Sequence, residues 1–327
     1  MTKKHRRRRN WSRIALLLIF AVAAIYAAAH CMFRAPELQS EKTSSAAPID
    51  EISAEEAAAA AALAAHTERR ENTYTILVSG IDNGNGGSDT NILVAVDAEA
   101  GRIHGVSIPR DTKAIINGDP HKINYAYNHG GTALLADTIS HQLGIPVDFT
   151  VTVDLNGFID LVDAIGGVDF YVPINMDYDD PLQNLTIHYT EGMHHLTGQQ
   201  AMEVVRFRQN NDGTGYGSQD IGRMQTQQNF LKAVAKQTLT LSNLDKVGSF
   251  AKIFRDSVDT DLSLGNLAWL GSEAISMGVD NITFSTLPGE WKSPYIYLDR
   301  EAVLPLVNEH LNPYVEDRVP EDLNLPD

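Results

Sequence analysis

Residues 73–98 read TYTILVSGIDNGNGGSDTNILVAVDA, two apolar runs separated by a loop of glycine, asparagine and aspartate. Short apolar runs rich in β-branched residues and bounded by turn-forming residues predict buried strands. A third run, RIHGVSIPR, follows a turn at residues 99–101. The sequence therefore predicts that a folded domain containing a sheet begins near Thr73.

Beyond this start, helical and strand patterns alternate to the end of the chain. Further strand patterns are FTVTVD, VDFYV, ITFSTLPG and YIYLD, and 173–196 is polar and rich in turn residues. Helical patterns cover 132–144, 155–167, 197–206, 220–241, 243–256, 263–277 and 299–313. A capping box at Thr197–Gln200 and an N-cap at Asp299 begin two of these helices. The alternation predicts one layered α/β domain over residues 73–327.

The N-terminal part predicts a membrane anchor. Residues 14–33 read IALLLIFAVAAIYAAAHCMF, which as a helix would span about one bilayer core. The flank before this run is HRRRRNWSR, and Arg34 follows it. The positive-inside rule therefore predicts a cytoplasmic head at 1–13, a transmembrane helix at 14–33 and everything later outside the cell. A cleaved signal peptide is the alternative, with small residues at 27–29.

Composition separates the anchor from the rest. Ser, Thr, Pro, Ala and Glu dominate residues 34–72, which predicts a stalk. The chain has 26 Lys and Arg against 42 Asp and Glu; eight basic residues and no acids lie in 1–34, so the remainder has a net charge of −24. An acidic exterior repels nucleic acid and argues against general DNA or RNA binding. A single cysteine, Cys31, excludes an intramolecular disulfide framework.

The glycine-rich loop at 80–90 carries two acids, Asp82 and Asp89. Such a loop after a strand can turn backbone N–H groups toward a phosphate, and paired carboxylates beside a phosphate suit Mg²⁺. The lysine of an ATP-binding P-loop is missing. An ordinary hairpin loop with turn-forming Asp and Asn remains the alternative for this loop alone.

Several basic residues stand beside loops or helix ends in this acidic domain. Arg110 and Asp111 follow Pro109 at the end of a strand, a common ligand position in α/β sheets. An extended chain at Arg206-Phe207-Arg208 would put both arginines on one side and Phe207 toward the core. Forked guanidiniums on one side suit a diphosphate, whereas cations that merely end a helix are the alternative.

The other candidates lie in a loop and on a long helix. Lys122 stands in the polar loop HKINYAYNHGG, where a solvated side chain is the simplest interpretation. Asp220, Arg223 and Gln227 share one helical stripe, and the first two could simply pair with each other. The five cations Arg110, Lys122, Arg206, Arg208 and Arg223 together suit a strongly anionic group such as pyrophosphate.

The ordered series GID…SDT, SIPRD, KIN-AY-GG, F-LVDAIGGV, RFR and D-x-x-R-x-x-x-QQ, between about 75 and 240, resembles the LytR-CpsA-Psr family. The resemblance implies a layered α-β-α sandwich with a mixed central sheet, outside the cell behind one membrane anchor. It also implies a phosphotransferase. Such enzymes move a glycopolymer, of teichoic acid or capsule type, from an undecaprenyl-pyrophosphate carrier onto peptidoglycan.

The same resemblance assigns roles to residues of this chain. Asp82 and Asp89 would hold Mg²⁺, and Arg110, Lys122, Arg206, Arg208 and Arg223 would hold the pyrophosphate, with the lipid tail in an apolar cavity between sheet and helices. Asp220 would orient the arginines and Gln227 would complete the pocket. Asp111 or Asp82 is the candidate base for the sugar hydroxyl.

Two positions depart from the family pattern. Gly87 precedes Ser-Asp-Thr where relatives often carry arginine, and Thr226 precedes the Gln pair where many also carry arginine. Both departures lower the positive charge of the expected site. These departures leave open a non-catalytic envelope protein that binds lipid or polymer. The same site would also serve a Mg²⁺-dependent polyprenyl-pyrophosphate hydrolase, with water as the attacker.

Overall fold

A computed structural model describes residues 33–38, 67–81, 87–182, 185–217, 219–239 and 247–326. The expected anchor at 14–33, apart from Phe33, and the loop acid Asp82 lie outside these residues. In the ranges that are described, no helix combines the length and the apolar character needed to cross a membrane.

The centre of the molecule is a six-stranded mixed sheet. Its strands are β1 (Thr73–Ile81), β2 (Ser88–Asp97), β3 (Arg102–Ile108), β6 (Phe149–Asp154), β11 (Asp259–Thr260) and β12 (Ile282–Thr286). They lie in the order β11-β6-β1-β2-β3-β12. β1 is parallel to β6 and β3 to β12, whereas β2 is antiparallel to both of its neighbours. The predicted α/β fold with a mixed sheet is confirmed.

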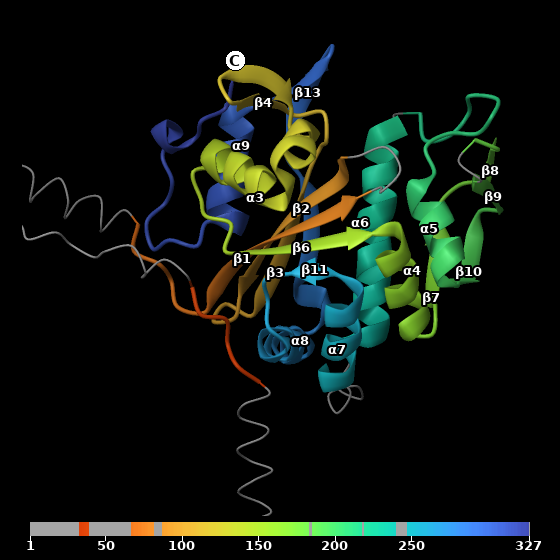
Figure 1. Ribbon diagram of the computed structural model, residues 1–327, viewed down its shortest axis with the longest axis horizontal. Coiled ribbons are helices and arrows are strands. Elements are labelled where there is room, and N and C mark those ends of the chain that lie inside the picture. The colour runs from red at the N-terminus through yellow and green to blue at the C-terminus, as the bar shows by residue number, and fades with distance from the viewer. Residues whose placement is uncertain are drawn as a thin grey trace, which may run out of the picture.

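Helices cover both faces of the sheet, which explains why its strands are continuous apolar runs rather than alternating ones. On one face, Leu77, Leu93 and Val106 pack against α3 (Asn124–Leu143) and α9 (Arg300–Leu306). On the other, Tyr74 and Ile76 pack toward α7 (Val247–Ser257) and α8 (Leu264–Met277). Figure 1 shows these two helical layers on opposite sides of the strands.

A second lobe stands beside β6 (Figure 1). Its elements are α4 (Leu155–Ala164), β7 (Val168–Val172), β8 (Met176–Asp180), β9 (Leu185–Tyr189), β10 (Gly192–Leu196), α5 (Gly198–Arg206) and α6 (Gln219–Thr238). The capping box is present, because Thr197 N donates to the Gln200 side chain over 2.9 Å. The three strands β8, β9 and β10 lie in the segment expected to be irregular. Their polar outward residues hide the alternation that buries Leu185 and Ile187.

The segment between β3 and α3 also differs from expectation. β4 (Lys113–Ile116) and β5 (Asp119–Lys122) form a hairpin, and α3 begins at Asn124 rather than near 132. The helix kinks at Gly131, whose φ of 64° and ψ of −158° are not helical. A glycine pair at 130–131 is typical of a helix end, but here the helix resumes after it.

The C-terminal part completes the first layer. β13 (Gly289–Lys292) and β14 (Tyr295–Leu298) form a second hairpin, and the Asp299 side chain accepts from Glu301 N and Ala302 N at the start of α9. The helical stretch expected between Asp299 and Pro313 is present, but it changes from α9 to a π-helix at Val307–Leu311.

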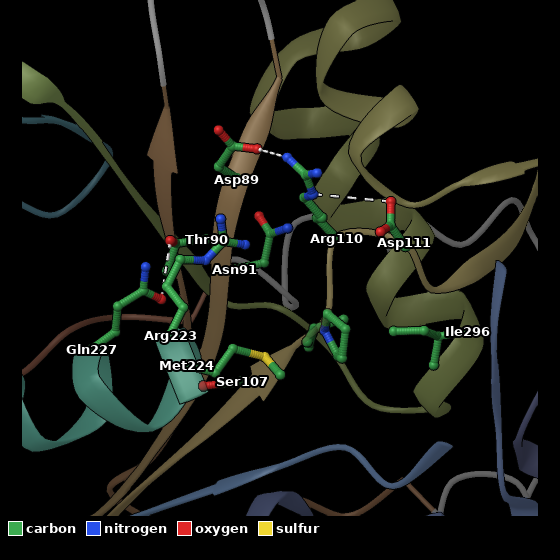
Figure 2. Close-up of a pocket in the computed structure, with 12 residues that line it drawn as sticks. Asp89, Thr90, Asn91, Ser107, Arg110, Asp111, Arg223, Met224, Gln227 and Ile296 are labelled. Atoms are coloured by element: carbon green, nitrogen blue, oxygen red, sulfur yellow. Dashed lines mark hydrogen bonds and ion pairs between the residues drawn. The ribbon is translucent and has the colours of Figure 1, made fainter. Parts of the chain in front are cut away.

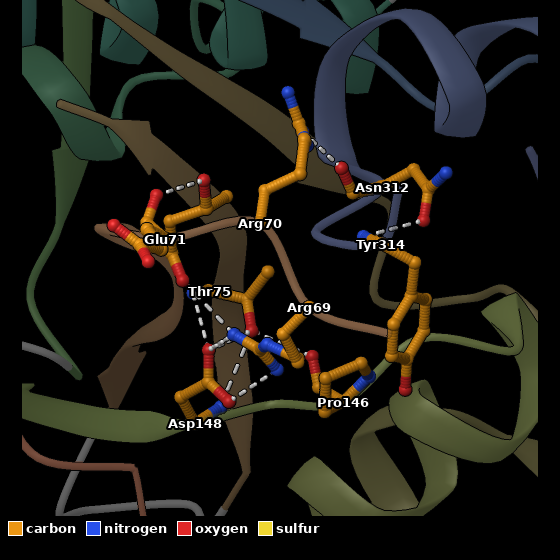
Figure 3. A network of polar contacts seen from close by, with 9 residues as sticks. Arg69, Arg70, Glu71, Thr75, Pro146, Asp148, Asn312 and Tyr314 are labelled. Atoms are coloured by element: carbon orange, nitrogen blue, oxygen red, sulfur yellow. Dashed lines mark hydrogen bonds and ion pairs between the residues drawn. The ribbon is translucent and has the colours of Figure 1, made fainter. Parts of the chain in front are cut away.

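Residues before Thr73 also contact the folded body. Arg69 forms a two-pronged ion pair with Asp148, and Asp148 Oδ2 accepts from Thr75 N as well (Figure 3). Arg70 pairs with Asp97 at 2.8 Å. Farther upstream, Arg34 N donates to Gly265 O on α8. The folded body therefore extends into both described ends of the segment expected to be a stalk.

Candidate active site

Strand directions gather the first candidate residues at one edge of the sheet. The carboxyl ends of β1, β3 and β6 lie beside the beginning of β2, because β2 runs against both of its neighbours. Asn91 is opposite Ile108 in the ladder, so residues just beyond that pair approach each other. Arg110 Nη1 donates to Asp89 Oδ1 over 2.6 Å (Figure 2).

A line of alternating charges continues from this pair. Arg110 Nε lies 4.0 Å from Asp111 Oδ1, and Lys122 Nζ lies 2.8 Å from the same oxygen. The β4–β5 hairpin returns Lys122 to the end of β3, where Ile123 N donates to Thr112 O over 2.8 Å. Asp111 is 8% exposed. The lysine expected in an open loop is therefore held against a nearly buried carboxylate.

The Arg-Phe-Arg motif has the extended geometry that would serve an anion. α5 ends at Arg206, and Phe207 has φ −57° and ψ 137°. Phe207 is 1% exposed and packs edge-on against the Tyr216 ring at 5.5 Å. Arg206 and Arg208 consequently lie on one side of the chain, where both line the same cavity.

α6 supplies the remaining described side chains. Arg223 is 7% exposed and lines the same cavity. Gln227 accepts from Thr90 Oγ1 at 3.4 Å and donates to Val205 O at 3.2 Å, so it joins the start of β2 to the end of α5. The Asp220 and Asp82 side chains lie outside the described part of the chain, and their roles stay predictions.

Two hollows meet at these residues. A pocket of about 30 Å³, drawn in Figure 2, is lined by residues that include Asp89, Arg110, Asp111, Arg223 and Gln227. A cavity of about 1140 Å³ shares all of these except Asp111. The small pocket is therefore a side chamber at the polar mouth of the large cavity.

The large cavity runs between the sheet and the helices α4, α6, α7 and α8, and most of its lining is apolar. Representative residues are Val78, Val94, Phe158, Phe230, Phe250 and Ile275. Its volume of about 1140 Å³ slightly exceeds that of most ligand pockets, which usually enclose about 300–1,000 Å³. The family resemblance implied an apolar cavity between the sheet and the helices, but the sequence did not identify the residues that line it. Burial alone does not reveal which face is left incompletely filled.

Local geometry explains both departures from the family pattern. Gly87 has φ 130°, a conformation that L side chains rarely adopt, and the Asn128 amide lies about 3.5 Å from where a Cβ would stand. Thr226 is 2% exposed, and its hydroxyl lies 2.7 Å from Tyr216 Oη. At this position, where the motif resemblance leads to the expectation of arginine, Thr226 instead anchors the Tyr216 loop to α6.

The described carboxylates could bind Mg²⁺ only if a substrate phosphate supplied further ligands. Among the residues with described side chains, no group of three or more His, Cys, Asp and Glu could hold a metal ion. Protein-bound Mg²⁺ usually takes one or two carboxylates and completes its shell with substrate phosphates and water. Asp89 is 47% exposed at the mouth of the cavity and can supply one such carboxylate.

The described residues of this α/β fold thus enclose a largely apolar cavity with Arg110, Arg206, Arg208 and Arg223 among its lining residues. The model of the LytR_cpsA_psr family matches residues 37–312, and the chain belongs to this family. The resemblance drawn from the motifs is thereby confirmed.

Two relatives and one solved structure illustrate the similarity. The chain is 32% identical over 207 residues to the polyisoprenyl-teichoic acid–peptidoglycan teichoic acid transferase TagV of Bacillus subtilis (strain 168), covering 60% of this chain and 52% of that protein. It is 34% identical over 204 residues to the transferase TagU of Halalkalibacterium halodurans, covering 60% of this chain and 64% of that protein. The chain thus spans between half and two thirds of these relatives. The crystal structure of B. subtilis TagV superposes with a TM-score of 0.63 and 29% identity, over 75% of this chain and 98% of that one.

Proposed function

We propose that the protein is a phosphotransferase that moves a glycopolymer from a polyprenyl-pyrophosphate carrier to peptidoglycan. The observation that carries this proposal is the apolar cavity of about 1140 Å³ with Arg110, Arg206, Arg208 and Arg223 among its lining residues. A polyprenyl chain matches the apolar part, and a pyrophosphate matches the forked guanidiniums. The names of the transferases TagV and TagU support the same reaction class.

The proposed step needs no nucleotide, because the pyrophosphate bond stores the required free energy. A sugar hydroxyl oxygen of the acceptor forms a bond to the phosphorus that carries the glycopolymer. The bond from that phosphorus to the bridging oxygen breaks, and polyprenyl phosphate leaves with the bonding electrons. The arginines hold both phosphates and stabilise the charge that develops on them.

The hydroxyl proton needs an acceptor, and Asp111 is the candidate among the described residues. Its carboxylate lies between Arg110 and Lys122 at the edge of the small pocket. Lys122 would hold this carboxylate in place, and its ammonium would balance the charge of the transferred phosphate. Asp82 is the alternative base that the sequence offers.

We also propose Mg²⁺ as the cofactor, with Asp89 as a ligand and Asp82 as the second ligand expected from the motif. When bound, the ion would neutralise phosphate charge. The cytoplasmic head, the anchor at 14–33 and the extracellular position of the domain belong to the proposal too. A substrate with a polyprenyl tail has to be met at a membrane surface.

The test is a transfer assay with the full chain, a polyprenyl-pyrophosphate glycan, Mg²⁺ and soluble peptidoglycan oligomers. Mass spectrometry would follow polyprenyl phosphate and linked product, with acceptor-free and chelator-treated samples as controls. Linked product that needs both acceptor and Mg²⁺ is the expected result. Polyprenyl phosphate without linked product would identify a hydrolase, and retained lipid without either product would identify a binding protein.

A further inference from the structure

An exposed tryptophan stands beside the small pocket without a part in the site described above. Trp291 is opposite Ile296 in the β13–β14 hairpin, and directly paired residues point to the same face of such a ladder. Ile296 lines the small pocket together with Arg110 and Asp111, and its N–H donates to Asp111 O over 2.8 Å. Trp291 therefore belongs to the face of the hairpin that is turned toward the candidate base.

The Lys122 ammonium lies close to both the Trp291 indole and the carboxylate of Asp111, the candidate base. Its ammonium lies 2.8 Å from Asp111 Oδ1 and 5.8 Å from the centroid of the Trp291 ring. Trp291 is nevertheless 54% exposed. Because indole buries a large apolar area when it meets a partner, this exposed ring offers a contact surface one lysine headgroup away from the reacting centre.

The Trp291 ring and the large apolar cavity lie on opposite sides of Arg110 and Asp111. Arg110 lines both hollows, whereas Asp111 and Ile296 line only the small pocket. Figure 2 shows Arg110 between Asp89 and Asp111, with Ile296 on the Asp111 side. The order is therefore cavity, Arg110, Asp111, and then the hairpin face that carries Trp291.

In phosphoryl transfer the attacking and leaving oxygens lie roughly in line on opposite sides of the phosphorus. With the leaving polyprenyl phosphate in the cavity, the attacking hydroxyl has to arrive from the Asp111 side. A pyranose ring has an apolar C–H face that stacks on an aromatic ring and hydroxyl groups that point outward. We propose that Trp291 is the stacking platform for a sugar ring of the acceptor, a peptidoglycan glycan strand, and so presents its hydroxyl to Asp111. This inference rests on the proposed function.

The same hairpin provides a matched control. Tyr297 is paired with Glu290, one position along the ladder, so it points to the opposite face. Its ring also has a lysine above it, with Lys113 Nζ at 4.8 Å from the centroid. Tyr297→Ala therefore removes an aromatic ring and its cation–π contacts with Lys113 and Lys292 without touching the proposed platform.

The experiment compares the full-length wild type with Trp291→Ala, Trp291→Tyr and Tyr297→Ala. Calorimetric titration with soluble, uncross-linked peptidoglycan strands, without lipid donor, measures acceptor binding, and the transfer assay gives KM for acceptor and for lipid donor. Trp291→Ala should weaken binding and raise the acceptor KM by about tenfold or more, a loss of roughly 1.4 kcal/mol, with the donor KM unchanged. Trp291→Tyr should restore most of the affinity, and Tyr297→Ala should bind the glycan and transfer like wild type.

The outcomes separate this inference from the proposed function. Glycan binding that depends on Trp291 in a protein without transfer activity would support the platform and refute the transferase. Transfer with an unchanged acceptor KM in Trp291→Ala would refute the platform and leave the transferase intact. A rise in the donor KM instead, or a wild type that binds no glycan strand, would also overturn the platform.

Discussion

The Arg110 guanidinium donates to the Asp89 carboxylate over 2.6 Å and so joins the end of β3 to the beginning of β2. The two side chains are 27% and 47% exposed, and a pair of this kind contributes only about 0–1 kcal/mol to folding. The ion pair matters for the candidate site rather than for stability, because it fixes the spacing between a cation and a carboxylate at the mouth of the cavity. A bound phosphate or metal ion has to fit this spacing or exchange with the pair.

Asp89→Asn should leave the melting temperature unchanged and lower transfer by about 100-fold, because it removes a charge but keeps the shape of the side chain. Mg²⁺ titration of the activity should also shift to higher concentration. Asp256→Asn on α7 is the control, since it makes the same change in a more exposed ion pair, between Asp256 and Lys252 at 3.0 Å, away from the cavity mouth. Equal loss of activity in both variants would contradict a site role for Asp89.

Arg206→Ala and Arg208→Ala should each reduce kcat by about 100- to 1,000-fold, the usual effect of removing one donor from a developing oxyanion. Both variants should remain folded, because the buried residue of the motif is Phe207. Circular dichroism and the transfer assay measure the two properties separately. Arg255→Ala, at an exposed position on α7, is the control. A folded Arg206 or Arg208 variant with full transfer activity would refute the assigned role.

Ala235→Phe should weaken binding of a long-chain polyprenyl pyrophosphate, because Ala235 is buried and lines the apolar cavity. Loss of space for several methylene groups should cost about tenfold or more in affinity, at about 0.8 kcal/mol for each buried CH₂. A short-chain analogue should bind the variant as well as wild type. Ala302→Phe makes the same change at an exposed position of α9 and should have no effect. Equal loss for both chain lengths would place the tail elsewhere.

Tyr216→Phe should destabilise the chain by about 1 kcal/mol, the usual net value of one buried hydrogen bond. Thr226→Val should cost more, because Thr226 Oγ1 also donates to Gly222 O over 3.0 Å. The two hydroxyls lie 2.7 Å apart, so the double variant should lose little more than Thr226→Val alone. Urea unfolding of the four proteins gives the coupling free energy. Strictly additive losses would show that the hydroxyl pair does not hold the Tyr216 loop on α6.

His104 should make stability depend on pH. Burial of the imidazole is the main cause that lowers the pKa of His104 from 6.5 to about 4. Electrostatic repulsion from His310, Arg102 and Lys232 lowers it further. Between pH 4 and 6.5 the unfolded chain binds more protons at this histidine than the folded chain does. The titration of His104 therefore leaves the free energy of unfolding unchanged above about pH 6.5 and lowers it by roughly 3 kcal/mol as the pH drops toward 4. Its ring nitrogens contact Thr283 Oγ1 and Ser285 Oγ at 2.6 and 2.8 Å. Urea unfolding of His104→Gln at pH 7 and 4.5 should show a shallower loss than wild type. Parallel losses would exclude His104 as the cause.

Local patterns were sufficient for the elements that carry their own signals. The apolar runs around Leu77 and Leu93 became central strands, and the caps at Thr197 and Asp299 start helices where expected. The glycine pair at 130–131 misled the helix boundary, because a kink and a helix end have the same local signature. The strands of 173–196 were missed because polar residues cover their exposed face.

The sequence by itself determined the fold class, the family and the set of charged residues that could meet a pyrophosphate. These depend on short-range pattern and on motif order, which every chain displays directly. Only the tertiary structure decided that Lys122 is held by Asp111, that Thr226 anchors Tyr216, and that the space behind Arg223 is a cavity. Such facts depend on which faces of distant elements pack together and how completely they fill the space between them. That is a property of the assembled layers and of no single segment.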